Sequence, residues 1–407
     1  MPTRIGPGIK IGQGILIDTP AFSANTLIIN PTIFLGNVVS LPTFDSVGGG
    51  VAPYTYSVTG TLPTGLSYNT STGVISGTAG TKTPKTSLVF RVTDSVGYAV
   101  TNFANIAVKS ATVPITYLVV GSGGGGGSSS GNLPGSLRGG GGGGGGVVTG
   151  NISLTTDQVY VATVSAGGAN NSNGGETSFT GVTPAVGGGA GGGGGNTGTP
   201  GGSGGGGGQY PAYNVSAQIA GGTGTAGQGS SGGVGFNYNW FYGGGGGGAG
   251  AAGNTGTANP LFPASIGGGG TGGIGRQVPA FLGFGDTRSP ASLGYFGGGG
   301  NGSIGNGGNP IQQLPVSGGG GTPASYSATT GANPTSYPIN GWSYTGGGGG
   351  GGNPVQTVGG SGGSGVVLLK IPTVDYSGVY GPAPAVDVST SGSDTILQFT
   401  SSGTYTA

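Results

Sequence analysis

The chain has 407 residues, of which 109 are glycine, and it carries ten Lys or Arg against nine Asp or Glu, with neither cysteine nor histidine. This composition argues against one large hydrophobic core, and it excludes disulfides, thiolate chemistry, imidazole acid–base catalysis and the usual zinc and iron sites. The balanced, sparse charge offers no basic surface for nucleic acid.

The N-terminal residues 1–23 repeat a short Ile-Gly pattern, IGPGIKIGQGILI. We expect an extended arm here, which attaches the chain to a neighbouring protein. Glycine and proline interrupt the stretch where a secretory signal would be continuously apolar, and nowhere do 18 apolar residues follow one another. The sequence therefore predicts a soluble protein made in the cytoplasm, without an export signal and without membrane insertion.

Residues 24–110 have the pattern of a β-sandwich. In SLVFRVTD, Leu88, Phe90 and Val92 alternate with more polar positions, which is the period-2 signature of a strand with one face in a core. Turn residues at 69–73 and 94–97 separate further strand-like runs. Short strands with regular turns favour an antiparallel sandwich.

The run LPTGLSYNTSTGVISGTAG, followed by FRVTDSVGYAVT, resembles the immunoglobulin-like repeat of bacterial and phage surface proteins. Its signature is LPxGL, then STGxISG, then VTDxxG. The resemblance implies a spacer or a weak binding module. Physically, we expect positive φ at the glycines of these motifs and a core from their apolar residues. The glycines are Gly65, Gly73, Gly77 and Gly97, and the core residues are Leu66, Val74, Ile75, Phe90 and Val92.

Residues 115–371 form a glycine-rich region framed by two apolar runs, ITYLVV near its start and GVVLLKI near its end. Both have the length and continuous apolar character of central strands, and we expect them to pair. With the segment VVTGNISLTTDQVYVATVSAGG, they resemble the glycine-rich domain of bacteriophage tail-fibre proteins. Residues 372–407, which contain TILQFTSSGTYTA, resemble the small C-terminal strand element of the same proteins.

Runs of four or more glycines begin at residues 123, 139, 191, 204, 243, 267, 297, 318 and 346. They could be flexible linkers. We favour a packed bundle of polyglycine II helices, with three residues per turn, because the runs are similar in length and lie between strands that fix their ends. Such helices form no internal hydrogen bonds, so each N–H and C=O needs a neighbouring run at a distance that admits no Cβ. The region resembles the tip adhesins of T-even-type bacteriophages, which are built as such a stack. The predicted fold class is all-β, an Ig-like sandwich followed by this bundle.

Aromatic inserts separate the glycine runs between residues 209 and 344, and they contain both tryptophans. Their rings could wedge the bundle, or they could form a binding surface together with Asn and Ser. We expect a mixture. Phe262, Phe281 and Phe284 are predicted to point inward, and the candidates for receptor binding are Tyr210, Tyr213, Tyr238, Trp240, Tyr242, Tyr337, Trp342 and Tyr344.

Catalytic motifs carry little weight in this sequence. Matches to G-x-S-x-G and G-x-G-x-x-G are expected by chance at this glycine content, and no histidine could complete a serine triad. Asp387 and Asp394 are the only close carboxylates near the C-terminus that we considered for glycoside cleavage, and solvated loop acids explain them better. We expect no enzyme activity, cofactor, catalytic residue or metal.

The function that these resemblances imply is that of a bacteriophage tail fibre or adhesin, external on the virion. It would bind other virion proteins through its N-terminal region and a host cell-surface protein or glycan through its aromatic inserts. The alternatives are an architectural head fibre, decoration or connector protein and, less favoured, a glycan-degrading tailspike. A homotrimer and a single chain on a trimeric fibre both stay open.

Overall fold

The computed structural model describes residues 8–11, 15–18, 21–26, 31–129, 137–209, 218–238, 240–258, 267–288, 293–303, 315–322, 339–353, 358–382 and 386–407. Within these ranges the chain consists of β-strands, irregular segments and short 3-10 turns, which confirms the predicted all-β class. The same ranges contain no helix of the length and apolarity that crossing a membrane requires. The chain divides into two units, Met1–Val113 and Pro114–Ala407.

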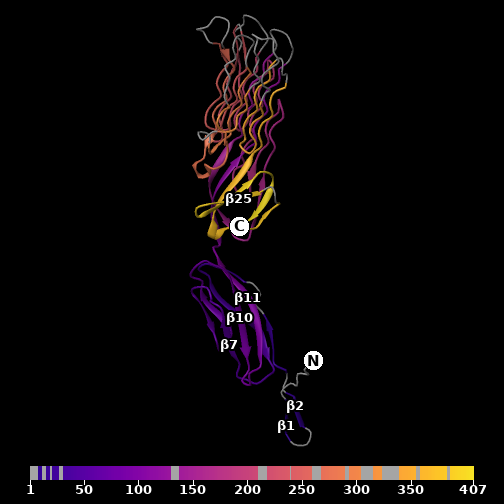
Figure 1. Ribbon diagram of the computed structural model, residues 1–407, viewed down its shortest axis with the longest axis vertical. Helices are drawn as coiled ribbons and strands as arrows, with labels where there is room; N and C mark the ends of the chain where they lie inside the picture. The colour runs from indigo at the N-terminus through magenta and orange to yellow at the C-terminus, as the bar shows by residue number, and fades with distance from the viewer. Residues whose placement is uncertain are drawn as a thin grey trace. The chain divides into compact units, whose positions relative to one another are not determined.

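The first unit contains an N-terminal hairpin, followed along the chain by a sandwich of short strands (Figure 1). The hairpin pairs β1 (Gly8–Ile11) with β2 (Ile15–Asp18). One sheet has the order β4-β11-β10-β7, another has the order β5-β9-β8, and β3 pairs with β6. These strands are β3 (Ser23–Thr26), β4 (Thr32–Phe34), β5 (Val38–Pro42), β6 (Phe44–Gly48), β7 (Thr55–Thr59), β8 (Leu66–Asn69), β9 (Val74–Thr78), β10 (Thr83–Thr93) and β11 (Ala99–Lys109).

The core of this unit follows the period-2 pattern of β10. Leu88, Phe90 and Val92 are at most 1% exposed, whereas Arg91 between them is exposed. Ile75 on β9 is also fully buried, while Val74 beside it is only half-buried because it points to the other face of its strand. Each fully buried side chain of this size contributes about 1.5–3 kcal/mol. Leu66 on β8 is half-buried and packs against this core. The predicted core is therefore confirmed for Ile75, Phe90 and Val92, with Leu66 at its edge and Val74 outside it.

The glycines of the Ig-like motifs adopt positive φ as predicted, with values of 87° at Gly65, 68° at Gly73, 130° at Gly77 and 98° at Gly97. Gly77 does so inside β9 and not in a turn. A Cβ at Gly77 would lie 2.2 Å from the carbonyl oxygen of Gly65. The two motifs therefore need glycine at these positions because their backbones touch.

The aspartate of the VTDxxG motif closes a turn. Asp94 is 4% exposed, and its carboxylate accepts hydrogen bonds from the main-chain N–H groups of Val51 (3.1 Å), Val96 (3.1 Å) and Tyr98 (2.8 Å). A buried carboxylate with three N–H donors is satisfied without a metal. Asp94 therefore has a structural role in the motif.

The second unit contains two sheets, one of five strands in the order β13-β12-β23-β26-β25 and one of four in the order β15-β14-β27-β24. The remaining strands are β12 (Thr112–Val120), β13 (Val147–Thr155), β14 (Val159–Thr163), β15 (Ser178–Phe179), β16 (Gln218–Ile219), β17 (Gly235–Tyr238), β18 (Trp240–Tyr242), β19 (Thr257–Ala258), β20 (Gly267–Gly268), β21 (Arg276–Gln277), β22 (Tyr295–Phe296), β23 (Val366–Pro372), β24 (Tyr380–Gly381), β25 (Val386–Ser391), β26 (Asp394–Phe399) and β27 (Gly403–Thr406). Two 3-10 turns span Pro279–Phe281 and Thr373–Asp375.

The two apolar runs that frame the glycine-rich region are neighbouring central strands. β12 and β23 pair antiparallel, so that Leu118 lies opposite Leu368 and Val120 opposite Val366. All four side chains are fully buried. This is the pairing that the sequence predicts. The C-terminal strands complete both sheets, because β26 pairs with β23 and β27 pairs with β14. The predicted boundary after Ile371 falls inside β23.

The glycine runs lie side by side and extend away from the five-stranded sheet (Figure 1). Their hydrogen bonds repeat every third residue. In the run 139–146, Gly140 and Gly143 donate to the carbonyls of 192 and 189, Gly141 and Gly144 to those of 244 and 247, and Gly142 and Gly145 to those of 349 and 346. The carbonyls of Gly143, Gly144 and Gly142 accept from the N–H groups of 124, 203 and 300. The central run is therefore bonded to six neighbours.

This packing leaves no room for side chains. A Cβ on Gly142 would lie 2.1 Å from the carbonyl oxygen of Gly124, and one on Gly145 would lie 1.8 Å from that of Gly121. Non-bonded carbon atoms rest about 3.5–4.0 Å apart. The contacts are with backbone that is held by its own hydrogen bonds, so the interior positions of the runs require glycine.

An apolar cluster joins the bundle to the five-stranded sheet, and we call this end of the bundle the sheet end. Val278, Phe281 and Phe296 from the inserts pack there with side chains of β12 and β23. Phe281 is 1% exposed and Phe284 packs against the same cluster, so both point inward as predicted. Phe262, the third ring predicted to point inward, lies outside the described residues.

Candidate functional site

Polar residues hold the runs together at the end of the bundle away from the sheet. We call this end the distal end, and it is marked by Ser129, Arg138, Gln209, Ser303 and Asn353. The Ser129 hydroxyl donates to the carbonyl of Asn353 (2.5 Å), Arg138 pairs with Gln209 through a β-bridge, and the Ser303 N–H donates to the carbonyl of Gly139 (3.1 Å). These contacts link neighbouring runs to one another at the end of the bundle where the central run, 139–146, begins.

Six interruptions of the described chain begin and end at the distal end. Before each one a run reaches this end, and after it the next run starts back toward the sheet. The flanking residues are Ser129 and Leu137, Gln209 and Gln218, Tyr238 and Trp240, Ala258 and Gly267, Thr322 and Ile339, and Asn353 and Val358. The Ile339 N–H, for example, donates to the carbonyl of Thr322 (2.9 Å). The bundle therefore gathers the attachment points of six segments on one surface.

Five of the eight receptor-binding candidates lie outside the described residues, either wholly or in their side chains. Tyr210, Tyr213 and Tyr337 lie outside the described residues. Tyr238 and Trp240 face each other in register in the pair β17–β18 at the distal end, but their side chains are outside what is described.

Tyr242 is not a surface residue, and its prediction as a receptor contact is wrong. Its side chain is 4% exposed, because β18 runs directly into the glycine run that starts at Gly243. A Cβ at Gly256 would lie 2.5 Å from the Tyr242 Cβ, so a neighbouring run packs against it. Burial raises the pKa of Tyr242 to about 12, against the opposing charge of Arg138. Tyr242 therefore packs between runs of the bundle.

Trp342 and Tyr344 are exposed, with 45% and 43% of their surface accessible, but they lie on the side of the bundle and not at its distal end. The Trp342 N–H donates to the carbonyl of Gly319 (2.8 Å), and Gly297 donates to the carbonyl of Thr345 (2.7 Å) near the sheet end. The structure thus separates these two aromatic residues from the surface that carries the six attachment points.

The Arg288 guanidinium packs against the ring of Trp342. Its guanidinium carbon lies 5.5 Å from the centre of the Trp342 ring, within the range of a cation–π contact. The same guanidinium binds the Asp286 carboxylate through two hydrogen bonds, of 2.8 Å and 2.6 Å. Asp286 also accepts hydrogen bonds from the N–H groups of Gly318 (3.1 Å) and Gly319 (3.2 Å). Asp286 and Arg288 therefore tie an insert, a glycine run and an exposed tryptophan together.

The Asp286 side chain is fully buried and remains ionised. Burial alone would raise its pKa, but hydrogen bonds and charge from Arg288, with the N–H of Gly319, outweigh this and hold the pKa below its usual value. Sequence reasoning missed this pair. The available signal was that Asp286 and Arg288 are two of the few charges in the glycine-rich region and stand two residues apart.

No catalytic arrangement emerges from the acids considered above. Asp394 forms an ion pair with Lys370 (3.2 Å), and Asp387 lies opposite Gln398 in the pair β25–β26, not opposite Asp394. Among the described residues, no three His, Cys, Asp or Glu side chains gather as a metal site would require.

Two family profiles match the chain. The family described as "Glycine-rich domain" matches residues 99–372, and the family described as "Putative Ig domain" matches residues 25–119. No curated protein matched the chain. The first match covers more than half of the sequence and includes the bundle together with the strands that frame it. The chain belongs to the glycine-rich domain family, with an Ig-like domain at its N-terminal side.

Proposed function

We propose that this chain is a fibre or adhesin protein of a bacteriophage virion, which presents variable loops on a glycine scaffold to the host cell surface. The observation that carries the proposal is the convergence of six chain segments on the distal end, since loops held by a rigid scaffold are where binding residues gather. The sequence resemblance to phage tail-fibre proteins and the two family matches point the same way. In this proposal the protein binds and does not catalyse.

The scaffold itself we interpret as a bundle of polyglycine II helices. The three-residue period of the lateral hydrogen bonds in the run 139–146 is the period of that helix. An eight-residue run would span about 25 Å at about 3.1 Å per residue. A stack held on all sides by backbone hydrogen bonds tolerates new sequences only in the segments that leave it, which suits a surface that must vary with its receptor.

The N-terminal residues 1–23 would attach the protein to another virion protein, and the Ig-like unit would act as a spacer. The host partner would be a cell-surface protein or a glycan. Aromatic residues in the inserts supply the large, rigid contact area that binding loops use.

The test is adsorption. Purified protein should bind cells of the host strain and block adsorption of the virus. Replacing residues 210–217 and 323–338 with Gly-Ser segments of equal length should abolish blocking while the thermal unfolding of both units stays unchanged. As a matched control, replacing residues 110 and 111, which connect β11 to β12, by Gly-Ser should leave blocking intact. Full blocking by the loop-replaced protein would refute the assignment of these loops to receptor binding.

A second candidate function is an architectural virion protein without receptor binding. It is favoured by Trp342 and Tyr344, because exposed aromatic side chains on the side of a bundle suit contacts with a neighbouring subunit. Antibody labelling of virions, seen by electron microscopy, separates the two candidates. Label at the tail tip supports the adhesin, and label on the capsid supports the architectural protein.

A further inference from the structure

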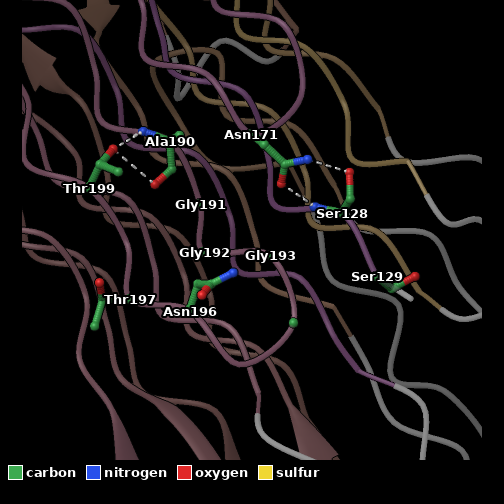
Figure 2. A pocket seen from close by; sticks show the side chains of 11 residues that line it. Ser128, Ser129, Asn171, Ala190, Gly191, Gly192, Gly193, Asn196, Thr197 and Thr199 are labelled. Carbon is green, nitrogen blue, oxygen red and sulfur yellow. Dashed lines mark hydrogen bonds between the residues drawn. The ribbon is translucent and has the colours of Figure 1, made fainter. Parts of the chain in front are cut away.

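A polar surface pocket of about 390 Å³ lies on the flank of the bundle next to the distal end, since Ser129 is one of its lining residues, where the arm of residues 195–200 folds back against the run 187–194 (Figure 2). The residues that contribute side chains or backbone to its wall include Ser128, Asn171, Gly193, Asn196 and Thr197. Its volume is within the range of small-ligand sites. We propose that this pocket binds a neutral sugar residue.

Ser128 is held in one orientation, as Figure 2 shows in part. Its N–H donates to the Asn171 Oδ1 (2.7 Å), while its hydroxyl oxygen accepts from the Nδ2 groups of Asn170 (2.8 Å) and Asn171 (2.7 Å). A hydroxyl has two acceptor positions and one proton. Both acceptor positions are used, and no acceptor for the proton is found among the described residues. The Ser128 hydroxyl is therefore a fixed hydrogen-bond donor at the pocket wall.

Asn196 and Thr197 supply the opposite side. Both side chains are exposed, and within the described chain neither forms a side-chain hydrogen bond. Their backbone is nevertheless fixed, because the Asn196 N–H donates to the carbonyl of Gly193 (2.8 Å) and its carbonyl accepts from the N–H of Gly208 (2.9 Å). The pocket thus offers an amide and two hydroxyls on a rigid backbone, which reduces the entropy cost of binding.

Gly193 provides the space between these groups. A Cβ on Gly193 would have the Asn171 Oδ1 at 3.2 Å, the Ser128 carbonyl oxygen at 3.4 Å and the Asn196 Nδ2 at 3.9 Å as neighbours, so it would need only small shifts. By contrast, a Cβ on Gly192 would collide with the carbonyl oxygen of Asn196 at 2.1 Å. Gly192 is needed for packing, whereas the missing side chain of Gly193 leaves room in the pocket.

The chemistry of the wall selects the ligand class. The described residues that line the pocket include no Lys, Arg, Asp or Glu, so neither an anion nor a cation would find a counter-charge among them. Among the described residues of the wall, the only apolar side chain is that of Ala190, which disfavours an apolar ligand. A neutral ring with several hydroxyls matches an amide that donates and accepts and hydroxyls that do both. The described wall has no aromatic ring for stacking, so affinity would be weak, with a Kd on the order of 1 mM.

The inference rests on the proposed function only for the source of the sugar, a host-surface glycan, and the binding itself is measured on the purified full chain. Saturation-transfer difference NMR with methyl glycosides of glucose, galactose and N-acetylglucosamine should give signal for at least one of them. Asn196→Ala and Thr197→Val should each weaken binding about fivefold, which is the effect of one neutral hydrogen bond. Gly193→Leu should abolish binding by filling the pocket. Thr163→Val, an exposed threonine of β14 away from the pocket, is the matched control and should bind as wild type.

Unchanged thermal unfolding of Asn196→Ala and Thr197→Val ensures that a loss of signal reports on the ligand and not on the fold. Sugar binding that survives all three pocket substitutions, or that Thr163→Val weakens equally, overturns the proposal. The absence of any signal with these glycosides overturns it as well. If the wild-type protein gives no signal with these glycosides but still blocks virus adsorption, the pocket proposal fails and the adhesin function is unaffected.

Discussion

The first unit buries Phe90 and Leu88 between two sheets, whereas the bundle of the second unit buries runs that consist almost entirely of glycine. In the sandwich, stability comes from apolar area removed from water. In the bundle, ordering each glycine costs about 1–2 kcal/mol and each lateral hydrogen bond returns about 0.5–1.5 kcal/mol. The interior of the bundle therefore contributes little net stability, and its ends must supply it.

The two regions therefore differ in the positions at which they can accept substitutions. The sandwich core accepts apolar substitutions of similar volume, while its turns need glycine at a few places such as Gly65 and Gly77. The central run 139–146 accepts no side chain, and the runs around it admit only a few small or polar ones, such as Ala190, Ser203 and Asn301. A scaffold whose central run excludes side chains would confine most substitutions to the segments at its ends, in keeping with the proposed adhesin function.

The strongest test of the comparison is Gly142→Ala. Its Cβ would lie 2.1 Å from the carbonyl oxygen of Gly124, and six hydrogen-bonded runs hold the surrounding backbone in place. We expect the second unit to lose at least about 4 kcal/mol and to fail to fold, while the first unit is unaffected. Differential scanning calorimetry should show the first unit's transition alone. Gly283→Ala is the matched control, because no atom lies within 4 Å of its Cβ position, and it should change stability by less than about 0.5 kcal/mol. Equal melting of the two variants would mean that the runs are not closely packed.

The reverse experiment is Phe90→Ala in the sandwich. Phe90 is fully buried, and its truncation should cost the first unit about 3–5 kcal/mol while the transition of the second unit stays in place. Urea unfolding, followed by tyrosine fluorescence, measures the loss. Phe103 on the neighbouring strand β11 is 70% exposed, so Phe103→Ala should cost less than about 1 kcal/mol. A similar loss for both variants would contradict the assignment of the core to one face of β10.

The sequence predicted those parts of the fold that have a local signal. The alternation in β10, the positive φ of the four motif glycines and the pairing of β12 with β23 all follow from patterns within a few residues. The partners of each glycine run could not be predicted, because identical residues carry no information on register or neighbours.

At the candidate site, local sequence likewise could not tell that Tyr242 is buried while Trp342 is exposed. Both lie near the end of an aromatic insert, yet Tyr242 is enclosed by the run at Gly256 while Trp342 lies on the outer side of the bundle. Which ring is buried depends on the order in which the runs pack. Asp286 and Arg288 could have been paired from their spacing, but their acceptors and donors at residues 316–320 come from a run that no local pattern connects to them.

A smaller effect is expected from the ion pair that ties an insert to the bundle. Asp286→Asn leaves the Arg288 guanidinium, whose side chain is 19% exposed, without its counter-charge, and should cost the second unit about 3 kcal/mol at neutral pH. The lowered pKa of Asp286 also makes wild-type stability depend on pH. The contribution is fully present above the ordinary pKa of 3.8 and is lost as the pH falls through the lower pKa of the folded state.

Unfolding free energies measured from neutral pH down into this acid range should therefore converge for the wild type and Asp286→Asn. The control is Asp394→Asn, which removes the partly exposed pair with Lys370 and should cost at most about 1 kcal/mol. Parallel pH curves for the wild type and Asp286→Asn would show that the buried carboxylate does not stabilise the folded state.

The smallest expected change is that of Trp342→Ala on the side of the bundle. Trp342 is 45% exposed and its contact with Arg288 is a cation–π pair, so its loss should lower the stability of the second unit by no more than about 1 kcal/mol. Trp342→Phe keeps a ring over the guanidinium and should lose less. Because the fold survives both substitutions, their effect on virus adsorption reports directly on contact. Adsorption blocked as well by Trp342→Ala as by the wild type would confine receptor binding to the distal end, whereas a loss that Trp342→Phe restores would extend the binding surface along the side of the bundle.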